Sequence, residues 1–586
     1  MSWFRSELAR RAPAEGDRQW IYVPYDQLTD RIGPLSRLAP EETGVVLVES
    51  LWKPRRRPYH RQKLALLLSA MRSFALEQAE RGVAVRYRTT SDRYSSALRT
   101  VTREVGPLRM MRAAERELRV DLQPLVDDDL IEVVPHDGWL TTDGDFTRSQ
   151  KDRPPWRMDA FYREVRRRTG ILMEEGRPVG GKFSFDTENR ERWPGSPPAP
   201  SPPTFPLDPL KDEVVELVRS RFSGHPGRLS PERLPATQAD AERAWRWAMT
   251  EALPTFGPFE DAMSTQSSTL FHTRTSELVN LHRLLPGELI DDVLGLDVPL
   301  QSREGFVRQL LGWREFVRHV HERTDGFRRW PGGPVIPNRE APGDAGYRRW
   351  RGHPWRADEG GTVDPDQDRP DAEAPEPGGE SASEPDGGAA PSFLGATTSL
   401  PPAFWGEPSG LKCLDQVVGE VWDQGYSHHI TRLMVLSNLA TLLEISPREL
   451  TDWFWVAYTD AYDWVVEPNV LGMGTFAAGA LMTTKPYVSG TPYIDRMSDY
   501  CGECALDPGT SCPITSLYWA FLYRHRDRLG DNARMRLPLA NLSRRSDAKR
   551  AMDGRVYQAV TGALSAGGRV TPEMMGDVIE TAEAEG

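Results

Sequence analysis

The chain has 586 residues, of which 39% are hydrophobic and 27% are charged, and its net charge is −12. These values are typical of a globular protein with two or three domains. No run of about 18 apolar residues occurs, which excludes a membrane-spanning helix. The first residues also lack the apolar stretch of a secretory signal peptide, so we expect a cytoplasmic protein.

Residues 18–150 alternate between segments typical of strands and of helices. Strands are expected in QWIYVPY, TGVVLVES, VAVRYRTT, LRMMRAA and LIEVVPHDG, which begin at residues 19, 43, 83, 108 and 130. These segments are short and rich in β-branched or other apolar residues, and residues 60–82 between the second and third have apolar positions at helical spacing. The alternation predicts a parallel sheet flanked by helices. No G-x-G-x-x-G motif follows the first strand, so no dinucleotide site is predicted there.

From about Pro206 the pattern becomes helical almost to the end of the chain. Apolar residues recur with a period near 3.6 in residues 212–222, 240–253, 302–324 and 427–445. The predicted organisation is an α/β domain (18–150), a connection (151–215), a helical part (216–356), an insertion (357–392), a second helical part (393–540) and a C-terminal helical tail (541–586).

The insertion holds most of the negative charge. Residues 357–392 contain eleven Asp or Glu and one Arg, a local charge of −10, which leaves about −2 for the rest of the chain. With no aromatic residue and one β-branched aliphatic residue, the segment cannot bury enough apolar surface to offset its ordering entropy. We therefore expect a disordered insertion. The remaining chain is close to neutral and can present a basic face to DNA.

The four cysteines are Cys413, Cys501, Cys504 and Cys512, and the last three form a C-x2-C-x7-C pattern. In a cytosolic protein this number of cysteines favours a metal site over disulfides. Thiolates at this spacing suit either zinc or an iron–sulfur cluster, and the spacing alone does not choose between them.

Five segments together resemble the iron–sulfur bacterial cryptochromes and photolyases, also called prokaryotic (6-4) photolyases or deoxyribodipyrimidine photolyase-related proteins. They are residues 158–173, 179–190, 304–316, 428–438 and 484–521. The resemblance implies the photolyase/cryptochrome fold, with an α/β N-terminal Rossmann-like antenna domain and an all-α C-terminal FAD-binding domain. It also implies FAD and a [4Fe–4S] cluster held by the four cysteines.

The resemblance assigns cofactor roles to several residues. Thr273, Thr275 and Ser276 match a phosphate-contacting segment, whereas Gln309, Trp313 and Arg314 match the flavin-pocket helix. Arg432 is expected over the flavin ring as a fixed cation. Asp460 is expected to accept hydrogen bonds from the ring or the ribityl chain.

Other matches concern catalysis and electron transfer. His429, with His428 beside it, matches the histidine placed against a (6-4) lesion, where an imidazole can move a proton near neutral pH. Tyr487 matches another residue of the lesion pocket. Trp405 and Trp453 match electron-transfer tryptophans.

The chain departs from the family pattern at several positions. Phe454 replaces an oxidisable tyrosine, Val466 stands where the family has a carboxylate facing flavin N5 (Glu467 follows one residue later), and Ala478 replaces an acid. Trp455 and Tyr458 are candidate substitutes for the missing tyrosine. In the segment where the family binds a lumazine antenna, Lys53 replaces an acidic residue that contacts the antenna. Whether this chain binds an antenna is therefore left open by the resemblance.

Two basic runs are candidate contacts for DNA phosphates: Lys53, Arg55, Arg56, Arg57 and Arg61, and Arg163, Arg166, Arg167 and Arg168. The leading hypothesis is a monomeric DNA photolyase that acts on ultraviolet-damaged DNA. The alternatives are a cryptochrome-like photoreceptor with a protein signalling partner, and a light-independent iron–sulfur DNA-binding module. Val466, Phe454 and Ala478 favour the photoreceptor, whereas His429, Arg432 and Tyr487 favour repair.

Overall fold

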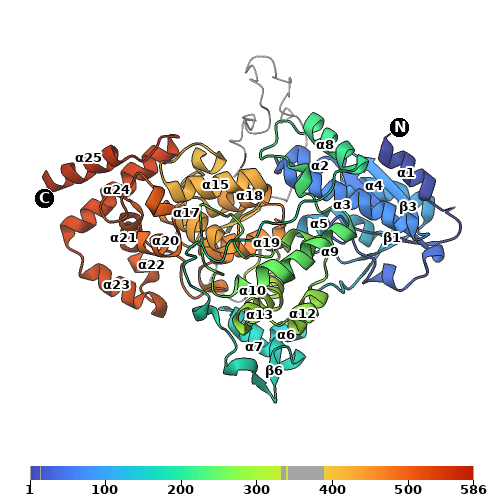
Figure 1. Cartoon of the computed structure of the whole chain (residues 1–586), viewed down its shortest axis with the longest axis horizontal. Coiled ribbons are helices and arrows are strands. Elements are labelled where there is room, and N and C mark those ends of the chain that lie inside the picture. The colour runs from blue at the N-terminus through green and yellow to red at the C-terminus, as the bar shows by residue number, and fades with distance from the viewer. Residues whose placement is uncertain (1, 14, 332–337, 341–346, 348–387, 585–586) are drawn as a thin grey trace.

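The computed structural model of this chain describes residues 2–13, 15–331, 338–340, 347 and 388–584. The α/β part and the C-terminal helices lie at opposite ends of the molecule (Figure 1). Residues 357–387 of the predicted acidic insertion lie outside the described residues. The last residues of the predicted insertion form strand β9 (Ala389–Pro391), which pairs antiparallel with β8 (Asn338–Glu340). The insertion therefore ends earlier than predicted.

The predicted parallel sheet is confirmed. Its strand order is β3-β2-β1-β4-β5, and every neighbouring pair is parallel. Its strands are β1 (Gln19–Tyr22), β2 (Thr43–Ser50), β3 (Ala84–Thr90), β4 (Leu108–Met111) and β5 (Ile131–Val134). Strand β2 is buried along its whole length, as expected for a central parallel strand that is covered on both faces.

Six helices belong to this part of the chain: α1 (Trp3–Arg11), α2 (Trp52–Arg56), α3 (Arg61–Glu80), α4 (Tyr94–Val105), α5 (Arg116–Asp127) and α6 (Asp143–Ser149). Of these, α3, α4 and α5 pack against strands of the sheet. Helix α1 precedes the predicted start of the domain at residue 18. It begins at the N-cap Ser2, buries only Phe4 and Leu8, and packs against α3.

The connection between the two parts is largely structured. It contains α7 (Met158–Thr169), the short hairpin of β6 (Met173–Glu174) and β7 (Arg177–Pro178), and α8 (Pro209–Arg221). Because α8 packs along α3, this segment of the chain belongs with the α/β part.

Apart from the pair formed by β8 and β9, the elements of the remaining described chain are helices. Its helices are α9 (Gln238–Trp247), α10 (Leu253–Phe256), α11 (Ser276–Asn280), α12 (Pro286–Gly295), α13 (Leu300–Val307), α14 (Glu315–Arg323), α15 (Lys412–Gln424), α16 (His429–Thr431), α17 (Asn438–Leu442), α18 (Pro447–Ala457), α19 (Asp463–Glu467), α20 (Thr491–Met497), α21 (Ile514–Arg524), α22 (Arg526–Leu529), α23 (Arg536–Ser543), α24 (Asp547–Ser565) and α25 (Pro572–Ala584). Helix α24 packs against both α21 and α25. No helix among the described residues is long and apolar enough to cross a membrane.

Three helices predicted as continuous are interrupted by π-helical turns. Segment η6 (Ala248–Ala252) separates α9 from α10, η7 (Arg308–Arg314) separates α13 from α14, and η9 (Arg432–Ser437) separates α16 from α17. Another π-helical segment, η10 (Pro468–Gly474), follows α19. Such turns occur frequently at functional sites, and η7, η9 and η10 lie around one cavity.

Candidate functional site

A cavity of about 910 Å³ lies within the helical part, and residues of η7, η9 and η10 contribute to its wall. This volume is in the range of about 300–1,000 Å³ that ligand and cofactor sites occupy. The predicted residues that line it are Thr273, Thr275, Ser276, Gln309, Trp313, Arg314, His428, His429, Arg432, Asp460 and Tyr487. The structure therefore brings together all the predicted cofactor and catalytic side chains.

Arg432 and Asp460 form a two-pronged ion pair in the wall of this cavity. Arg432 Nη1 and Nη2 donate to the two carboxylate oxygens of Asp460 at 3.1 and 3.0 Å, and Ser276 Oγ donates to the same carboxylate at 2.7 Å. Burial opposes ionisation of Asp460, but Arg432 and Ser276 lower its pKa below the usual range. The pair is thus fixed in its charged form before any ligand binds.

Arg314 is a buried cation in the wall of the cavity. Its side chain is buried, Nη1 donates to Glu315 at 3.0 Å, and its guanidinium carbon lies 4.2 Å from the ring centre of Trp139. Within the described residues, Arg314 Nε and Nη2 have no hydrogen-bond partner. Burial lowers the pKa of Arg314 to about 10, so it stays cationic at neutral pH. A buried positive charge in the wall favours an anionic ligand group in the cavity.

Thr273 and Thr275 also line the cavity and share a hydrogen bond of 2.9 Å between their hydroxyl oxygens. Gln309 also lines it, and its amide donates to Glu260 at 2.8 Å. Hydroxyl, amide and guanidinium groups among the lining residues are the kinds of group that a dinucleotide with a pyrophosphate needs.

Three histidines meet in the cavity. His272, which we did not single out from the sequence, stacks on His428 with ring centres 4.5 Å apart and an interplanar angle of 13°. His429 contacts His272 edge-on at 5.4 Å. Ring nitrogens of all three lie within 4.8 Å of one another. A ring nitrogen binds a metal in the plane of its ring, so two stacked rings do not share one ion.

The environments of the two adjacent histidines push their pKa values apart. Burial, together with the charges of His429 and Arg432, lowers the pKa of His428 well below its ordinary value, so His428 is neutral. Desolvation also opposes charge on His429, but Asp261, whose carboxylate lies 3.5 Å from His429 Nε2, raises its pKa. His429 is the more exposed of the pair, with 41% of its side chain accessible. Such a pair can divide the roles of proton donor and acceptor.

The predicted tryptophans do not line the cavity but lead away from it. Trp405 stacks on Trp422 at 5.3 Å and 17°, and Trp422 contacts Trp453 at 5.8 Å. The indoles of Trp422 and Trp453 both donate to the carbonyl oxygen of Phe404, at 3.0 and 2.8 Å. Trp422 was not predicted, because nothing in the sequence distinguishes it among eighteen tryptophans.

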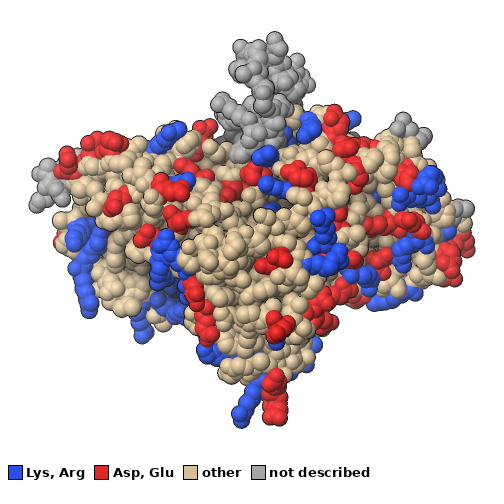
Figure 2. Space-filling model, in the orientation of Figure 1, with Lys and Arg blue, Asp and Glu red and all other residues tan. Residues whose placement is uncertain are grey.

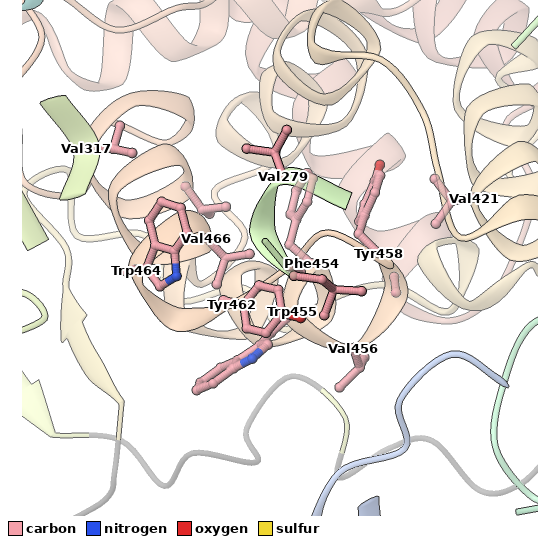
Figure 3. Packing of buried hydrophobic residues seen from close by; sticks show 14 of the residues in the cluster. Val279, Val317, Val421, Phe454, Trp455, Val456, Tyr458, Tyr462, Trp464 and Val466 are labelled. Atoms are coloured by element: carbon pink, nitrogen blue, oxygen red, sulfur yellow. The ribbon is translucent and has the colours of Figure 1, made fainter. Parts of the chain in front are cut away.

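The aromatic series continues from Trp453 to the cavity. Trp453 contacts Tyr458 at 6.0 Å, and Tyr458 stacks on Phe454 at 5.2 Å and 11°. Figure 3 shows Phe454 and Tyr458 side by side. The Tyr458 ring centre lies 4.1 Å from the guanidinium carbon of Arg432. Trp455 instead lies under Arg57 at 4.3 Å, so Tyr458 is the better placed substitute for an oxidisable residue at Phe454.

Val466 and Glu467 face different environments. Val466 lines the cavity, whereas Glu467 does not. Glu467 accepts hydrogen bonds from His321 and Arg448, both at 2.9 Å, and is 2% exposed. Glu467 is therefore committed to a buried ion pair away from the cavity. Ala478 is buried and is not among the lining residues.

The four cysteines converge as predicted, although they are far apart in the sequence. Cys413 lies in the first turn of α15, and Cys501, Cys504 and Cys512 lie between α20 and α21. All four line one small cavity of about 20 Å³. Thr491 Oγ1 donates to the Cys512 sulfur at 3.3 Å. This site therefore joins α15 to the chain that precedes α21.

Part of the predicted DNA-contacting set is wrong. Lys53 and Arg57 are buried and pair with Glu117 at 3.1 and 2.7 Å, and Arg61 is buried and donates to the carbonyl of Gly227. Arg166 is buried too, and its guanidinium donates to backbone carbonyls that include that of Phe183. The remaining residues of the two runs, Arg55, Arg56, Arg163, Arg167 and Arg168, keep at least part of their side chains accessible.

The chain is similar to proteins of known kind along most of its length. Residues 21–234 match a family described as deoxyribodipyrimidine photo-lyase-related protein. A (6-4) photolyase of Agrobacterium fabrum is 31% identical over 552 residues, which cover 90% of this chain and 96% of that protein. A solved cryptochrome of Synechocystis is 13% identical, covers 92% of this chain and 95% of its own, and has a TM-score of 0.50. A solved bacterial class III photolyase from Agrobacterium tumefaciens covers 98% of each chain at 15% identity, with a TM-score of 0.46.

Proposed function

This chain belongs to the deoxyribodipyrimidine photolyase-related family, and its similarity to a (6-4) photolyase extends over 90% of its length. We therefore propose that it is a light-driven DNA photolyase acting on (6-4) lesions. The observation that carries the proposal is that the flavin-binding and lesion-contacting residues expected for this family line one cavity. Its substrate would be a pyrimidine photoproduct turned out of the base stack into that cavity.

The cavity fits FAD. The positive charge of Arg314 in the cavity wall would stabilise the pyrophosphate, to which Thr273 and Thr275 would donate hydrogen bonds. Arg432, fixed by Asp460, would present a positive charge beside the ring. When bound in its reduced form and excited by light, FAD would supply the electron that starts repair.

His429 and His428 would handle the proton. Asp261 raises the pKa of His429, which favours His429 as the donor to the lesion. His428 is held neutral by burial, so the proton stays on His429 rather than passing to its neighbour. Tyr487, whose pKa burial raises, lines the same cavity as a neutral hydroxyl. Acid and base would thus sit side by side against one substrate.

The aromatic series would carry electrons inward from the surface. Trp405 is partly accessible, and Trp422 and Trp453 are fully buried. Tyr458 completes the series behind the cavity wall, in contact with the lining residues Phe454 and Arg432. The replacement of tyrosine by Phe454 therefore leaves an oxidisable ring in contact with Trp453.

The four cysteines would hold a [4Fe–4S] cluster. A tetrahedral zinc ion with bonds of about 2.3 Å keeps its sulfur ligands about 3.8 Å apart. Among the described residues, the ring nitrogens of His272, His428 and His429 lie within 4.8 Å of one another, but no three of the cysteine sulfur atoms do. This wider spacing favours a cluster of several irons over a single zinc ion.

The residues around Lys53 do not fit a lumazine antenna. Lys53 is buried, pairs with Glu115 and Glu117, and donates to the hydroxyl of Tyr25. These groups satisfy one another, so none is left to hold a chromophore, and we propose none there.

A cryptochrome-like photoreceptor is the second candidate, because Val466 lines the cavity where the family has a carboxylate. Light-dependent repair of an oligonucleotide with one defined (6-4) lesion separates the two functions. We expect restored pyrimidines under blue light, none in the dark, and a large loss with His429→Ala. Normal flavin photochemistry without repair in the wild-type protein would contradict the photolyase and favour the photoreceptor.

A further inference from the structure

A basic surface borders the mouth of the cavity. The mouth is lined by Arg190, Lys485 and Arg534, and burial and the charges of Arg534 and Arg190 lower the pKa of Lys485. Arg534 belongs to the short 3-10 helix η13 (Ala533–Met535), which leads directly into α23. Asn532 Nδ2 donates to the carbonyl of Thr484 at 2.9 Å and ties this segment to the rim.

Arg190 pairs with Asp186 and Asp261, but four other basic side chains of this surface are uncommitted. Arg534, Arg536, Arg544 and Lys549 are exposed, and none forms an ion pair with another described residue. Nearby Arg545, by contrast, pairs with Asp553 at 2.5 Å. Lys and Arg side chains gather over α22–α24 at the left of Figure 2. Uncompensated positive charge next to a substrate mouth indicates a polyanionic partner.

One exposed apolar side chain lies among these basic residues. Leu537, in the first turn of α23, is 72% exposed, the highest value for a large hydrophobic side chain in the described chain. A single exposed leucine on a surface is ordinary. Leu537, however, lies between Arg536 and Arg544 on the helix that follows η13 at the rim of the cavity. This position beside the substrate opening, and not its exposure alone, indicates a contact with the substrate.

A lesion turned into the cavity leaves a gap in the duplex. Unstacking costs a few kcal/mol per step, and DNA-bending proteins offset that cost by inserting an apolar side chain between the bases. A helix that offers cations for the phosphates and a leucine for the gap has the chemistry this requires.

We propose that η13 and α23 form a second DNA-contacting element: Arg534, Arg536 and Arg544 bind the backbone beside the lesion, and Leu537 enters the base stack that the lesion has left. This proposal rests on the photolyase function and deepens it, because it assigns duplex DNA, rather than single strands, as the preferred substrate. No covalent step is involved.

The test uses full-length holoprotein and two duplexes, one with a single (6-4) lesion and one undamaged. Leu537→Ala should lose about tenfold in affinity for the lesion duplex and keep its affinity for the undamaged one. A 2-aminopurine base placed beside the lesion should brighten on binding, and this signal should change in the variant. Leu207→Ala is the matched control, since Leu207 is 56% exposed but is not part of the cavity lining.

Arg536→Ala tests the phosphate contacts. It should weaken binding to both duplexes alike and reduce the slope of log K against log salt by about 1. Unchanged binding of the lesion duplex by both Leu537→Ala and Arg536→Ala would overturn the inference while leaving the photolyase function intact. A wild-type protein that neither prefers nor repairs the lesion duplex would instead contradict the proposed function.

Discussion

Replacing Glu467 by glutamine should destabilise the wall of the cavity without touching its lining. Glu467 ends α19 and accepts hydrogen bonds from His321 on α14 and Arg448 on α18. The three side chains are at most 2% exposed. Glutamine keeps the shape of the side chain but removes the charge, and one of its amide hydrogens would face a donor.

The magnitude follows from the pKa of Glu467. Burial alone would raise it, but the hydrogen bond from His321 and the charge of Arg448 lower it from 4.5 to about 2. That difference corresponds to about 3 kcal/mol of folding free energy, close to the cost of about 3–5 kcal/mol for breaking a buried pair.

The sign of the pH dependence is fixed by the same values. A carboxyl group with a lowered folded-state pKa stabilises the fold fully above its unfolded pKa, 4.5, and loses this effect as the pH falls through about 2. At pH 3 the contribution should have fallen to about 1.4 kcal/mol. The difference between wild type and Glu467→Gln should therefore shrink between pH 4.5 and 2.

Native-state hydrogen exchange of the α18 and α19 amides measures the local opening free energy. Glu288→Gln is a suitable control, because Glu288 pairs with Arg31 at the surface, with half of its side chain exposed, and should cost less than about 0.5 kcal/mol. A loss below about 1 kcal/mol for Glu467→Gln at pH 7, or a loss at pH 3 that is as large as the loss at pH 7, would refute the reasoning.

Three further outcomes are expected. Cys413→Ser should lose the bound iron and loosen α15, because this ligand joins remote segments; elemental analysis that finds a full iron content would sink the cluster assignment. Trp422→Phe should slow photoreduction of the bound flavin by an external thiol while the absorption spectrum stays unchanged, and Trp455→Phe, outside the series, should not. Deleting residues 357–387, which carry the local charge of −10, should strengthen DNA binding at low salt, and equal affinity across salt concentrations would count against a repulsive role.

The parallel sheet could be predicted because buried parallel strands are continuous apolar runs. Helix α1 could not, since it buries only Phe4 and Leu8 and its other residues are polar or exposed. The π-helical turns η7 and η9 were also missed, because a single extra residue in a turn does not disturb apolar periodicity enough to show.

The residues of the site were predicted from the resemblance to a family. The errors concern residues whose burial or role depends on contacts with residues far away in the sequence. A run of arginines usually marks a solvated face, but Arg57 and Arg61 are buried and bind Glu117 and the carbonyl of Gly227. Trp422 and His272 gain their importance from stacking on partners remote in the chain. No local pattern signals such contacts.

The π-helical turns have a consequence for comparing relatives of this protein. Removing one residue from η9 would let this segment relax to an α-helical turn. The residues that precede the deletion would then be rotated by about 100° about the helix axis relative to the residues that follow it. Arg432 opens this turn and Ser437 closes it, so such a deletion would separate side chains that now share the cavity wall. The length of the chain in η7, η9 and η10 is therefore as strongly constrained as its residues. In an alignment of relatives that keep the same pocket, gaps should avoid these three turns and fall in the loops between helices.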